Sequence, residues 1–371
     1  MTPTKVVLCA LAAAVVGAAA IPTARADEIP EKFRKPVEKG LDWLAKSQNE
    51  KGFWGVAANT DTYPISMTAL AGMALLMEGS TIKEGKYADK IRKAADWLMD
   101  KCQDGNQRDG LIGDPNVPSE SYRYMYGHGF GLMFLASVFG EETDAKKRAK
   151  LKDILTRAVK YTVNAQSSRG GWYYTSRTEG GDNDEGSVTI TQVQALRAAR
   201  NAGISVPLDA IRKTKEYLSA CTSPSGAVYY SFNSKQERPA ITAAAVSCLF
   251  NAGDYKDELG KKWLKYCQRM IPTEMSARLG HDEYTHYYFA QCMYVLGDRG
   301  WEKLFGPTPE AERLTWTKYR NSLGDQLIRV QNQDGSWSSG GNFGSVGPVY
   351  CTSVFLTILQ LDKGVLPIYQ R

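Results

Sequence analysis

Gln48–Trp54 reads QNEKGFW, Gln166–Trp172 reads QSSRGGW and Gln331–Trp337 reads QNQDGSW. The three stretches share the pattern Q-x-x-x-G-x-W. Their glutamines are 118 and 165 residues apart, which corresponds to two intervals of 59 and three intervals of 55 residues. A period in the mid-fifties predicts six structural repeats within the chain of 371 residues.

Weaker copies of the motif occur where this period places them. They are Cys102–Gly105, Thr222 with Gly226, and Cys267–Gln268. An aromatic residue also stands five positions before the motif in five of the six repeats: Trp43, Trp97, Tyr161, Tyr217 and Trp263. The sixth repeat has Gln326 at this position. The agreement between the two marks supports a repeat along the whole chain.

Each repeat is predicted to form a hairpin of two helices. The first helix is amphipathic, because its apolar residues recur with a period of 3.6 and lysines and arginines occupy the opposite face. The second helix is apolar around most of its circumference, which predicts burial on all sides. These second helices are expected within residues 67–77, 130–138, 188–199, 241–250, 284–296 and 349–361.

The alternation of polar-faced and all-apolar helices favours an outer and an inner layer. Stacked repeats bury the apolar faces of their neighbours, and an inner set buried on all sides favours a ring that closes on itself. We therefore predict an all-α protein with an α/α toroid fold, an α6/α6 barrel of six helical hairpins. An open superhelix is the alternative.

The motif has a structural interpretation. Gly52, Gly170 and Gly335 can adopt positive φ angles and are expected to end the outer helix. The glutamine can bond backbone groups at that helix end, and the tryptophan is expected to pack on the neighbouring repeat. We therefore expect these side chains to hold the repeats together rather than to carry chemistry.

Residues 1–26 are predicted to be a secretory signal peptide, and residues 27–371 a single toroid domain. A basic residue near the N-terminus, an apolar run and the sequence Ala24-Arg25-Ala26 form the order of regions typical of a cleaved signal. We therefore expect an exported protein, periplasmic or secreted, that has no membrane span after cleavage.

The composition and the cysteine spacing argue against a nucleic-acid partner and against a cysteine-rich zinc site. Hydrophobic residues make up 43% and charged residues 23% of the chain, as in globular proteins. The net charge of +6 is modest and not clustered, which argues against a nucleic-acid partner. The cysteines form no C-x-x-C pair, so we expect mostly free, buried thiols. Neither a metal site nor a cofactor is predicted.

Repeated Q-x-x-x-G-x-W motifs on helical hairpins resemble the QW motifs of the squalene cyclase and protein prenyltransferase β-subunit superfamily. The resemblance covers about residues 31–371. Tyr126–Gly129 (YGHG) and Tyr284–Tyr288 (YTHYY) also resemble exported bacterial proteins described as prenyltransferase and squalene oxidase repeat proteins. The resemblance implies a toroid with a central cavity and a ligand that is an isoprenoid or another apolar molecule.

The catalytic motifs of this superfamily are incomplete here. Cyclases protonate an alkene through a D-x-D-D motif, which requires a carboxyl made unusually acidic by its neighbours. The nearest match, Asp182–Glu185 (DNDE), ends in Glu and is followed by Gly-Ser instead of Thr-Ala. A solvated loop or a loose calcium site is the alternative interpretation. The D-x-C zinc element of the prenyltransferases is absent, although His128-Gly129 resembles their His-Gly diphosphate contact.

A ligand site is expected at the mouth of the ring where the inner helices begin, because free amides and polar side chains gather there. Imidazoles and carboxylates at such a mouth are the usual groups of acid–base sites. The candidate catalytic residues are His128, Asp184, Glu185 and His286. The candidate ligand-binding residues are Tyr126, His281, Tyr284, Tyr287 and Tyr350. Alternatively, His128 and His286 cap helices and pack against tyrosines.

Three classes of function remain open, and the sequence does not decide whether the protein is an enzyme. An enzyme acting on an isoprenoid or another apolar ligand predicts a deep cavity lined by aromatic residues. A carbohydrate-active enzyme, such as a polysaccharide lyase or hydrolase, predicts an open polar cleft with arginines, tyrosines and carboxylates. A non-catalytic binding or scaffold protein predicts a plugged cavity and an exposed apolar patch. The ligand, a small molecule or a glycan, and any partner protein stay unidentified.

Overall fold

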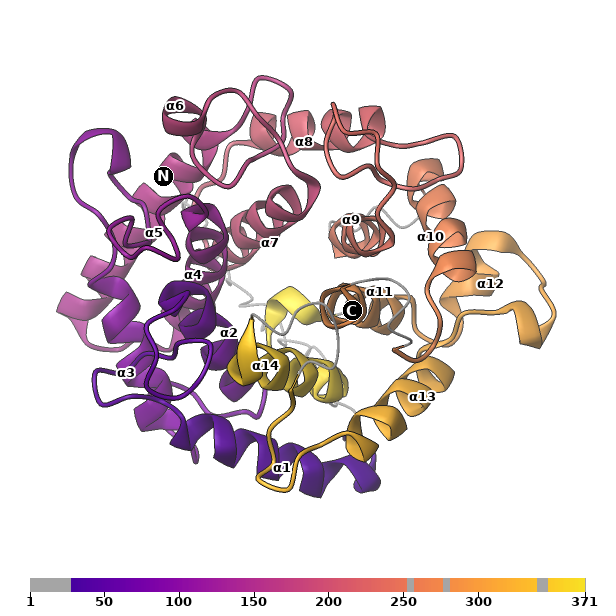
Figure 1. Ribbon diagram of the computed structural model, residues 1–371, viewed down its shortest axis with the longest axis horizontal. Coiled ribbons are helices and arrows are strands. Elements are labelled where there is room, and N and C mark those ends of the chain that lie inside the picture. The colour runs from indigo at the N-terminus through magenta and orange to yellow at the C-terminus, as the bar shows by residue number, and fades with distance from the viewer. Residues whose placement is uncertain (1–27, 252–256, 276–280, 339–345, 371) are drawn as a thin grey trace, which may run out of the picture.

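The computed structural model describes residues 28–251, 257–275, 281–338 and 346–370, and the predicted signal peptide lies outside these ranges. Within them the chain is helical, and the only strand-like pairing is in isolated bridges such as Trp172–Glu185. The long helices form two concentric rings around one axis (Figure 1). The chain therefore has the predicted α/α toroid fold.

The outer ring contains the amphipathic helices: α1 (Glu31–Lys46), α3 (Ala88–Met99), α5 (Ala145–Ala165), α8 (Leu208–Ala220), α10 (Glu258–Met270) and α13 (Trp316–Arg329). The inner ring contains the apolar helices: α2 (Pro64–Leu76), α4 (Tyr124–Val138), α7 (Gly186–Asn201), α9 (Pro239–Asn251), α11 (Asp282–Leu296) and α14 (Gly347–Leu359). Two short helices, α6 (Arg177–Gly180) and α12 (Gly300–Phe305), lie in the connections.

The distribution of apolar residues explains the two layers. On α1 the buried side chains, among them Val37, Leu41 and Leu44, lie on one face, and the charged side chains face solvent. Every residue of α2 is buried, so this helix has to be enclosed by others. The inner helices contact one another in chain order, and α14 contacts α2. The ring is therefore closed, as predicted, and the open superhelix is excluded.

The motif glutamine joins consecutive outer helices. Gln48 Nε2 donates to the carbonyl of Gly52 at 2.8 Å in its own loop, and to the carbonyl of Lys90 at 2.9 Å on α3. Gln166 makes the equivalent bonds to its own loop and to α8. Gln331 bonds its own loop and α1, so the same pair of hydrogen bonds joins the last repeat to the first.

The motif glycine has a role that differs from the predicted one. Gly52 has a φ of +93°, but α1 already ends at Lys46, so the glycine does not end the helix. A Cβ at Gly52 would lie 2.8 Å from the carbonyl oxygen of Lys93 on α3. Glycine therefore lets the loop approach the backbone of the next outer helix, in a conformation that side chains disfavour.

The motif tryptophan is buried between helices. Trp337 Nε1 donates to the carbonyl of Leu327 on its own outer helix at 2.8 Å. Trp54 and Trp172 make the same bond within their repeats. The Trp337 ring also lies against Gly40 of α1, where a Cβ would be 2.7 Å from the ring. At this position the tryptophan packs on the neighbouring repeat, as its sequence predicts.

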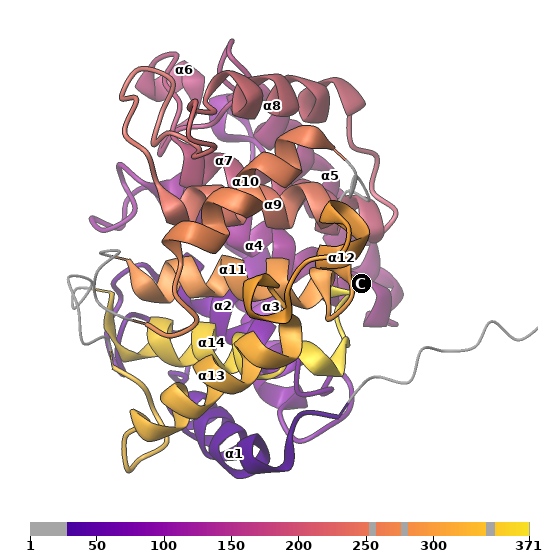
Figure 2. The same cartoon turned by 90° about the vertical axis from the view of Figure 1, so that its right-hand side faces the viewer.

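The C-terminal turns close one end of the ring. The turn at Leu361–Lys363 contacts α11 and α14, and the turn at Pro367–Tyr369 contacts α7. Tyr369 is buried, and its hydroxyl lies 2.8 Å from the hydroxyl of Tyr287 on α11. Figure 2 shows the C-terminus at the end of the ring opposite to the one where the inner helices begin. The open mouth is therefore at the start of the inner helices.

Three further features bear on function. None of the helices in the described ranges is long and apolar enough to cross a membrane. The six cysteines from Cys102 to Cys351 carry free thiols, and all but Cys102 are buried. Among the described residues, no group of three His, Cys, Asp or Glu side chains is arranged to hold a metal ion.

Candidate functional site

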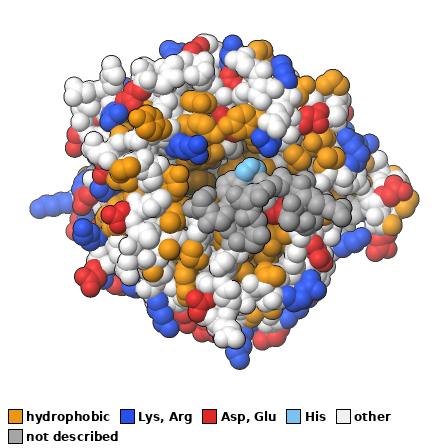
Figure 3. All heavy atoms as spheres, in the orientation of Figure 1, with side chains coloured by type: hydrophobic (Ala, Val, Ile, Leu, Met, Phe, Trp, Pro, Cys, Tyr) orange, Lys and Arg blue, Asp and Glu red, His pale blue; other side chains and the backbone are white. Residues whose placement is uncertain are grey.

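A cavity of about 450 Å³ opens at the mouth of the ring. Its volume lies within the range of small-molecule sites. All six inner helices, or the loops that lead into them, contribute to its wall. On the face shown in Figure 3, hydrophobic side chains gather around a central hollow. The mouth predicted from the starts of the inner helices is therefore hollow enough to hold a ligand.

The wall of the cavity is apolar inside and polar at the rim. Met67, Leu70 and Phe130 lie further along their inner helices and form the floor. The remaining apolar lining is Ala240, Ile241 and Val346. The rim carries the charged or titratable side chains Glu120, Arg123, Glu185, Arg238 and His281. Six tyrosines complete the wall: Tyr63, Tyr174 and Tyr230 in the loops that lead into inner helices, and Tyr126, Tyr284 and Tyr350 in the first turns of inner helices. Such a wall suits a ligand with an apolar body and a polar end.

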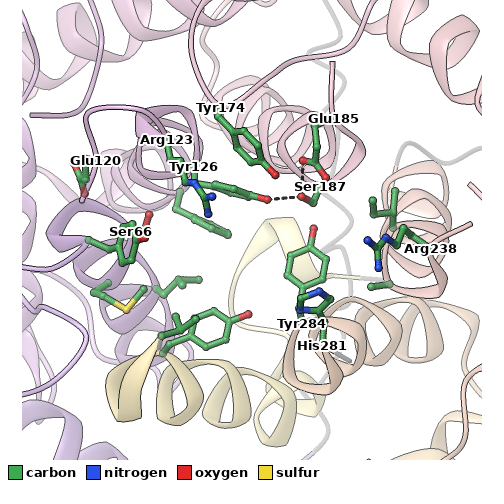
Figure 4. A pocket seen from close by; sticks show the side chains of 18 of the residues that line it. Ser66, Glu120, Arg123, Tyr126, Tyr174, Glu185, Ser187, Arg238, His281 and Tyr284 are labelled. Carbon is green, nitrogen blue, oxygen red and sulfur yellow. Dashed lines mark hydrogen bonds between the residues drawn. The ribbon is translucent and has the colours of Figure 1, made fainter. Parts of the chain in front are cut away.

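Glu185 lies at the N-terminal cap of α7 and lines the cavity. Its Oε2 accepts hydrogen bonds from the Val188 amide at 2.8 Å and from Ser187 Oγ at 2.6 Å. Ser187 Oγ is also hydrogen-bonded to the hydroxyl of Tyr126, so a chain of bonds runs from a cavity phenol to the carboxyl (Figure 4). Glu185 Oε1 has no hydrogen-bond partner within the described residues.

The environment makes Glu185 a weaker acid than a free glutamic acid. The side chain is 1% exposed, and its burial raises its pKa above the usual range. Alkene protonation needs an unusually strong acid, so burial changes the pKa of Glu185 in the opposite direction. Burial therefore favours the protonated form of Glu185, which can donate a hydrogen bond to an oxygen acceptor.

Glu120 is a second buried carboxyl at the cavity, and the sequence did not predict it. Its Oε1 accepts from the Ile65 amide at 3.0 Å, so Glu120 caps α2 from the loop of the next repeat. Its Oε2 lacks a partner among the residues described, and burial raises its pKa to about 7. Glu120 lies in an irregular loop without a motif, so no signal in the sequence indicates that it reaches across to α2.

Two tyrosines and two arginines form an arc of the rim, with Tyr174 and Tyr230 in the middle and Arg123 and Arg238 at its two ends. The hydroxyls of Tyr174 and Tyr230 are 2.5 Å apart. Arg123 Cζ lies 5.2 Å from the ring centroid of Tyr174, and Arg238 Cζ lies 5.4 Å from that of Tyr230. Such distances place each guanidinium within the range of cation–π attraction. Tyr174 was not predicted as a site residue. It follows Trp172 by two residues, so the position of the repeat motif places it at the mouth of the ring.

His128 faces away from the cavity. It is fully buried, its Nδ1 accepts from the Ile112 amide at 3.0 Å, and its Nε2 bonds Thr162 Oγ1 on α5 at 2.8 Å. Because Nδ1 accepts, the imidazole is neutral with its proton on Nε2. Burial lowers the pKa of His128 to about 3. The side chain therefore joins α4 to the loop and helix behind it.

His286 lies in the same position on α11. It is fully buried, and its Nδ1 lies 2.7 Å from the hydroxyl of Tyr319 on the outer helix α13. Burial lowers its pKa to about 4. Neither His128 nor His286 lines the cavity, which matches the alternative interpretation that these residues pack against tyrosines.

Asp184 and Tyr287 also lie outside the cavity wall. Asp184 Oδ1 accepts from the Tyr217 hydroxyl at 2.9 Å and from the Phe232 amide at 2.8 Å, so the carboxylate holds two loops to α8. Tyr287 bonds Tyr369 at the closed end. The structure therefore brings together five of the nine predicted site residues: Tyr126, Glu185, His281, Tyr284 and Tyr350.

No protein-family model matches the chain, and no curated protein matches it in sequence. Solved structures do resemble it. A variant of the type II terpene cyclase MstE from Scytonema, in complex with its substrate geranylgeranyl dihydroxybenzoate, is 12% identical over 90% of this chain and 98% of that chain, with a TM-score of 0.58. The α-1,6-mannanase GH76A from Salegentibacter, in an inactive variant with α-1,6-mannotriose, is 9% identical over 89% of this chain and 99% of that chain, with a TM-score of 0.60. These likenesses show a shared α/α toroid fold.

Proposed function

We propose that the protein is exported and binds an amphipathic small molecule in the cavity at the mouth of the ring. The apolar body of the ligand, an isoprenoid or a similar chain, would lie against Met67, Leu70 and Phe130. The observation that carries this proposal is an apolar floor below a polar rim in a cavity closed at its far end. The likeness to a toroid solved with a geranylgeranyl-bearing substrate supports it.

The polar end of the ligand would meet the hydrogen-bonded chain at Glu185. Burial favours the protonated carboxyl, which donates a hydrogen bond, and Oε1 is the oxygen without a partner among the described residues. An ether, carbonyl or hydroxyl oxygen on the ligand is the matching acceptor. Any catalysis by Glu185 would then be general acid catalysis at oxygen.

Calorimetric titration of the mature protein with farnesol tests the apolar part of this proposal. The Ala240→Phe variant places an aromatic ring in the cavity wall and is expected to weaken farnesol binding at least tenfold. Ala145→Phe is the matched control, because Ala145 is an exposed residue at the start of α5. A wild-type protein that does not bind farnesol, or an Ala240→Phe variant that binds it equally well, would contradict the proposal.

Native mass spectrometry of the protein purified from its own host tests export and ligand together. Cleavage after Ala26 gives a chain that begins at Asp27, so the measured mass reports export directly. Lipid extraction from the same sample identifies a resident ligand. A full-length mass would contradict the exported state, independently of the outcome of the farnesol titration.

A glycan is the second candidate ligand. The tyrosines of the rim provide flat surfaces for sugar rings, Glu120 and Glu185 provide carboxyls, and a mannanase has the same fold. Binding of α-1,6-mannotriose by a protein that does not bind farnesol would favour this candidate.

A further inference from the structure

Arg238 has an unsatisfied donor inside the rim of the cavity. It directly precedes α9, and its side chain points into the cavity (Figure 4). One terminal nitrogen donates to Gln236 Oε1 at 2.9 Å. Arg238 Nε is buried and makes no hydrogen bond to any described residue. A buried guanidinium N–H without an acceptor is costly, and the side chain that carries it lines the cavity in which a ligand would lie.

Neither arginine of the rim has a carboxylate counterion among the described residues. Elsewhere Arg108 pairs with Glu179 at 2.8 Å and Arg320 pairs with Asp362 at 2.8 Å. In the part of the chain that the structure describes, neither Arg123 nor Arg238 lies within 4.0 Å of a carboxylate oxygen. The positive end of the α9 dipole adds to the charge beside Arg238. The rim therefore presents positive charge that no described carboxylate neutralises by direct pairing.

The two carboxyls of the cavity do not take over this role. Glu120 and Glu185 each accept from the first backbone amides of an inner helix, which fixes their orientation toward α2 and α7. Both are almost fully buried, and burial favours their neutral forms. Arg123 and Arg238 instead stack on Tyr174 and Tyr230, whose joined hydroxyls hold the two rings in place.

We propose that Arg238 binds an anionic oxygen head group, a carboxylate or a phosphate, on the ligand whose apolar body fills the cavity. Arg123 lies on the other side of the opening and contributes positive potential that attracts the same group. Tyr230 and Tyr174 are positioning residues, because they support the guanidinium planes. This inference rests on the proposed function and adds the charge of the ligand to it.

Three probes with one tail separate the head group from the apolar body. Farnesol, farnesoic acid and farnesyl phosphate are titrated into the mature protein by calorimetry at low salt. The two anions are expected to bind about tenfold more tightly than farnesol, since the extra free energy of a charge-assisted hydrogen bond over a neutral one corresponds to about this ratio of dissociation constants. The advantage is expected to shrink as the salt concentration rises. Comparing the acid with the phosphate identifies which head group the site prefers.

Variants assign the effect to Arg238. Arg238→Gln is expected to remove the preference for the anions over farnesol, and Arg238→Lys to retain part of it. Arg123→Gln is expected to reduce the preference by about threefold through the lost potential. Arg269→Gln is the matched control, because Arg269 also stacks on a tyrosine, Tyr266, at 5.9 Å but does not line the cavity.

The outcomes separate this inference from the function it rests on. Farnesol binding with no advantage for either anion would overturn the head-group site and leave the apolar cavity standing. An advantage that survives Arg238→Gln would also overturn it. If none of the three probes binds, both the head-group site and the isoprenoid-binding function are wrong.

Discussion

At the scale of single residues, His128 occupies a position near the start of an inner helix that accepts the same backbone hydrogen bond in other repeats. Thr189 Oγ1 accepts from the Trp172 amide at 2.9 Å, and Thr68, Thr242 and Thr352 make the same bond at the start of their inner helices. His128 Nδ1 does so in the second repeat. The imidazole therefore takes the place of a threonine hydroxyl. Unlike the hydroxyl, an imidazole can bind a proton in acid.

His128→Thr is expected to make the protein less sensitive to acid. The pKa of His128 is about 3 in the folded state and 6.5 in the unfolded chain, so the unfolded state binds the extra proton as pH falls below about 6.5. Stability is therefore lost between pH 6.5 and 3, by about 2 kcal/mol at pH 5 from this residue. Urea unfolding at pH 7 and pH 5 measures the difference. An unchanged pH dependence in the variant would contradict this account.

The sequence predicted at which end of the inner helices the site lies. It did not predict which face of each helix lines the cavity. Tyr126 and His128 are two residues apart on α4, which is about 200° around a helix axis. Tyr284 and His286 have the same spacing on α11. One member of each pair lines the cavity and the other faces the outer ring. Because the inner helices are apolar all round, their sequence carries no amphipathic signal that separates the two directions.

At the scale of elements, the glutamine of the motif joins neighbouring outer helices through hydrogen bonds rather than through apolar packing. Outer helices present amphipathic faces with charged residues between them, so apolar contact alone does not fix their register. Gln166 bonds the carbonyls of Gly170 and Ala210 and is nearly buried. The three full motifs were recognisable because this geometry requires the same residues each time. The loops that follow them vary, and the position of Glu120 was therefore not predictable.

Gln166→Ala is expected to lower the free energy of unfolding by about 2 kcal/mol, because two buried carbonyls lose a donor. Gln268→Ala is the matched control from the fifth repeat, where the motif is degenerate and the glutamine makes its bond at an exposed site. Its expected loss is below about 1 kcal/mol. Thermal unfolding of both variants measures the difference. Equal losses would show that the full motif contributes nothing beyond a surface hydrogen bond.

At the scale of the whole molecule, the seam between the first and last repeats decides whether the ring behaves as one unit. Two glycines allow the close approach of helices there. A Cβ at Gly324 on α13 would lie 2.3 Å from the ring of Phe33 on α1, and a Cβ at Gly40 on α1 would lie 2.7 Å from the ring of Trp337. Gln331 bonds α1 across the same seam. Side chains at these positions would force the ring open where its two ends meet.

Gly40→Val is expected to lower the free energy of unfolding by about 2 kcal/mol, since overpacking a buried contact of this kind displaces both helices. Hydrogen exchange followed by mass spectrometry locates the effect. In a closed ring, protection is expected to fall in α1 and in α13 and α14 together, although these helices lie at opposite ends of the sequence. Gly140→Val is the control, because a Cβ there meets no atom within 4 Å. A loss confined to α1 would mean that the last repeat does not depend on the first, and the seam would then be a contact between independent ends.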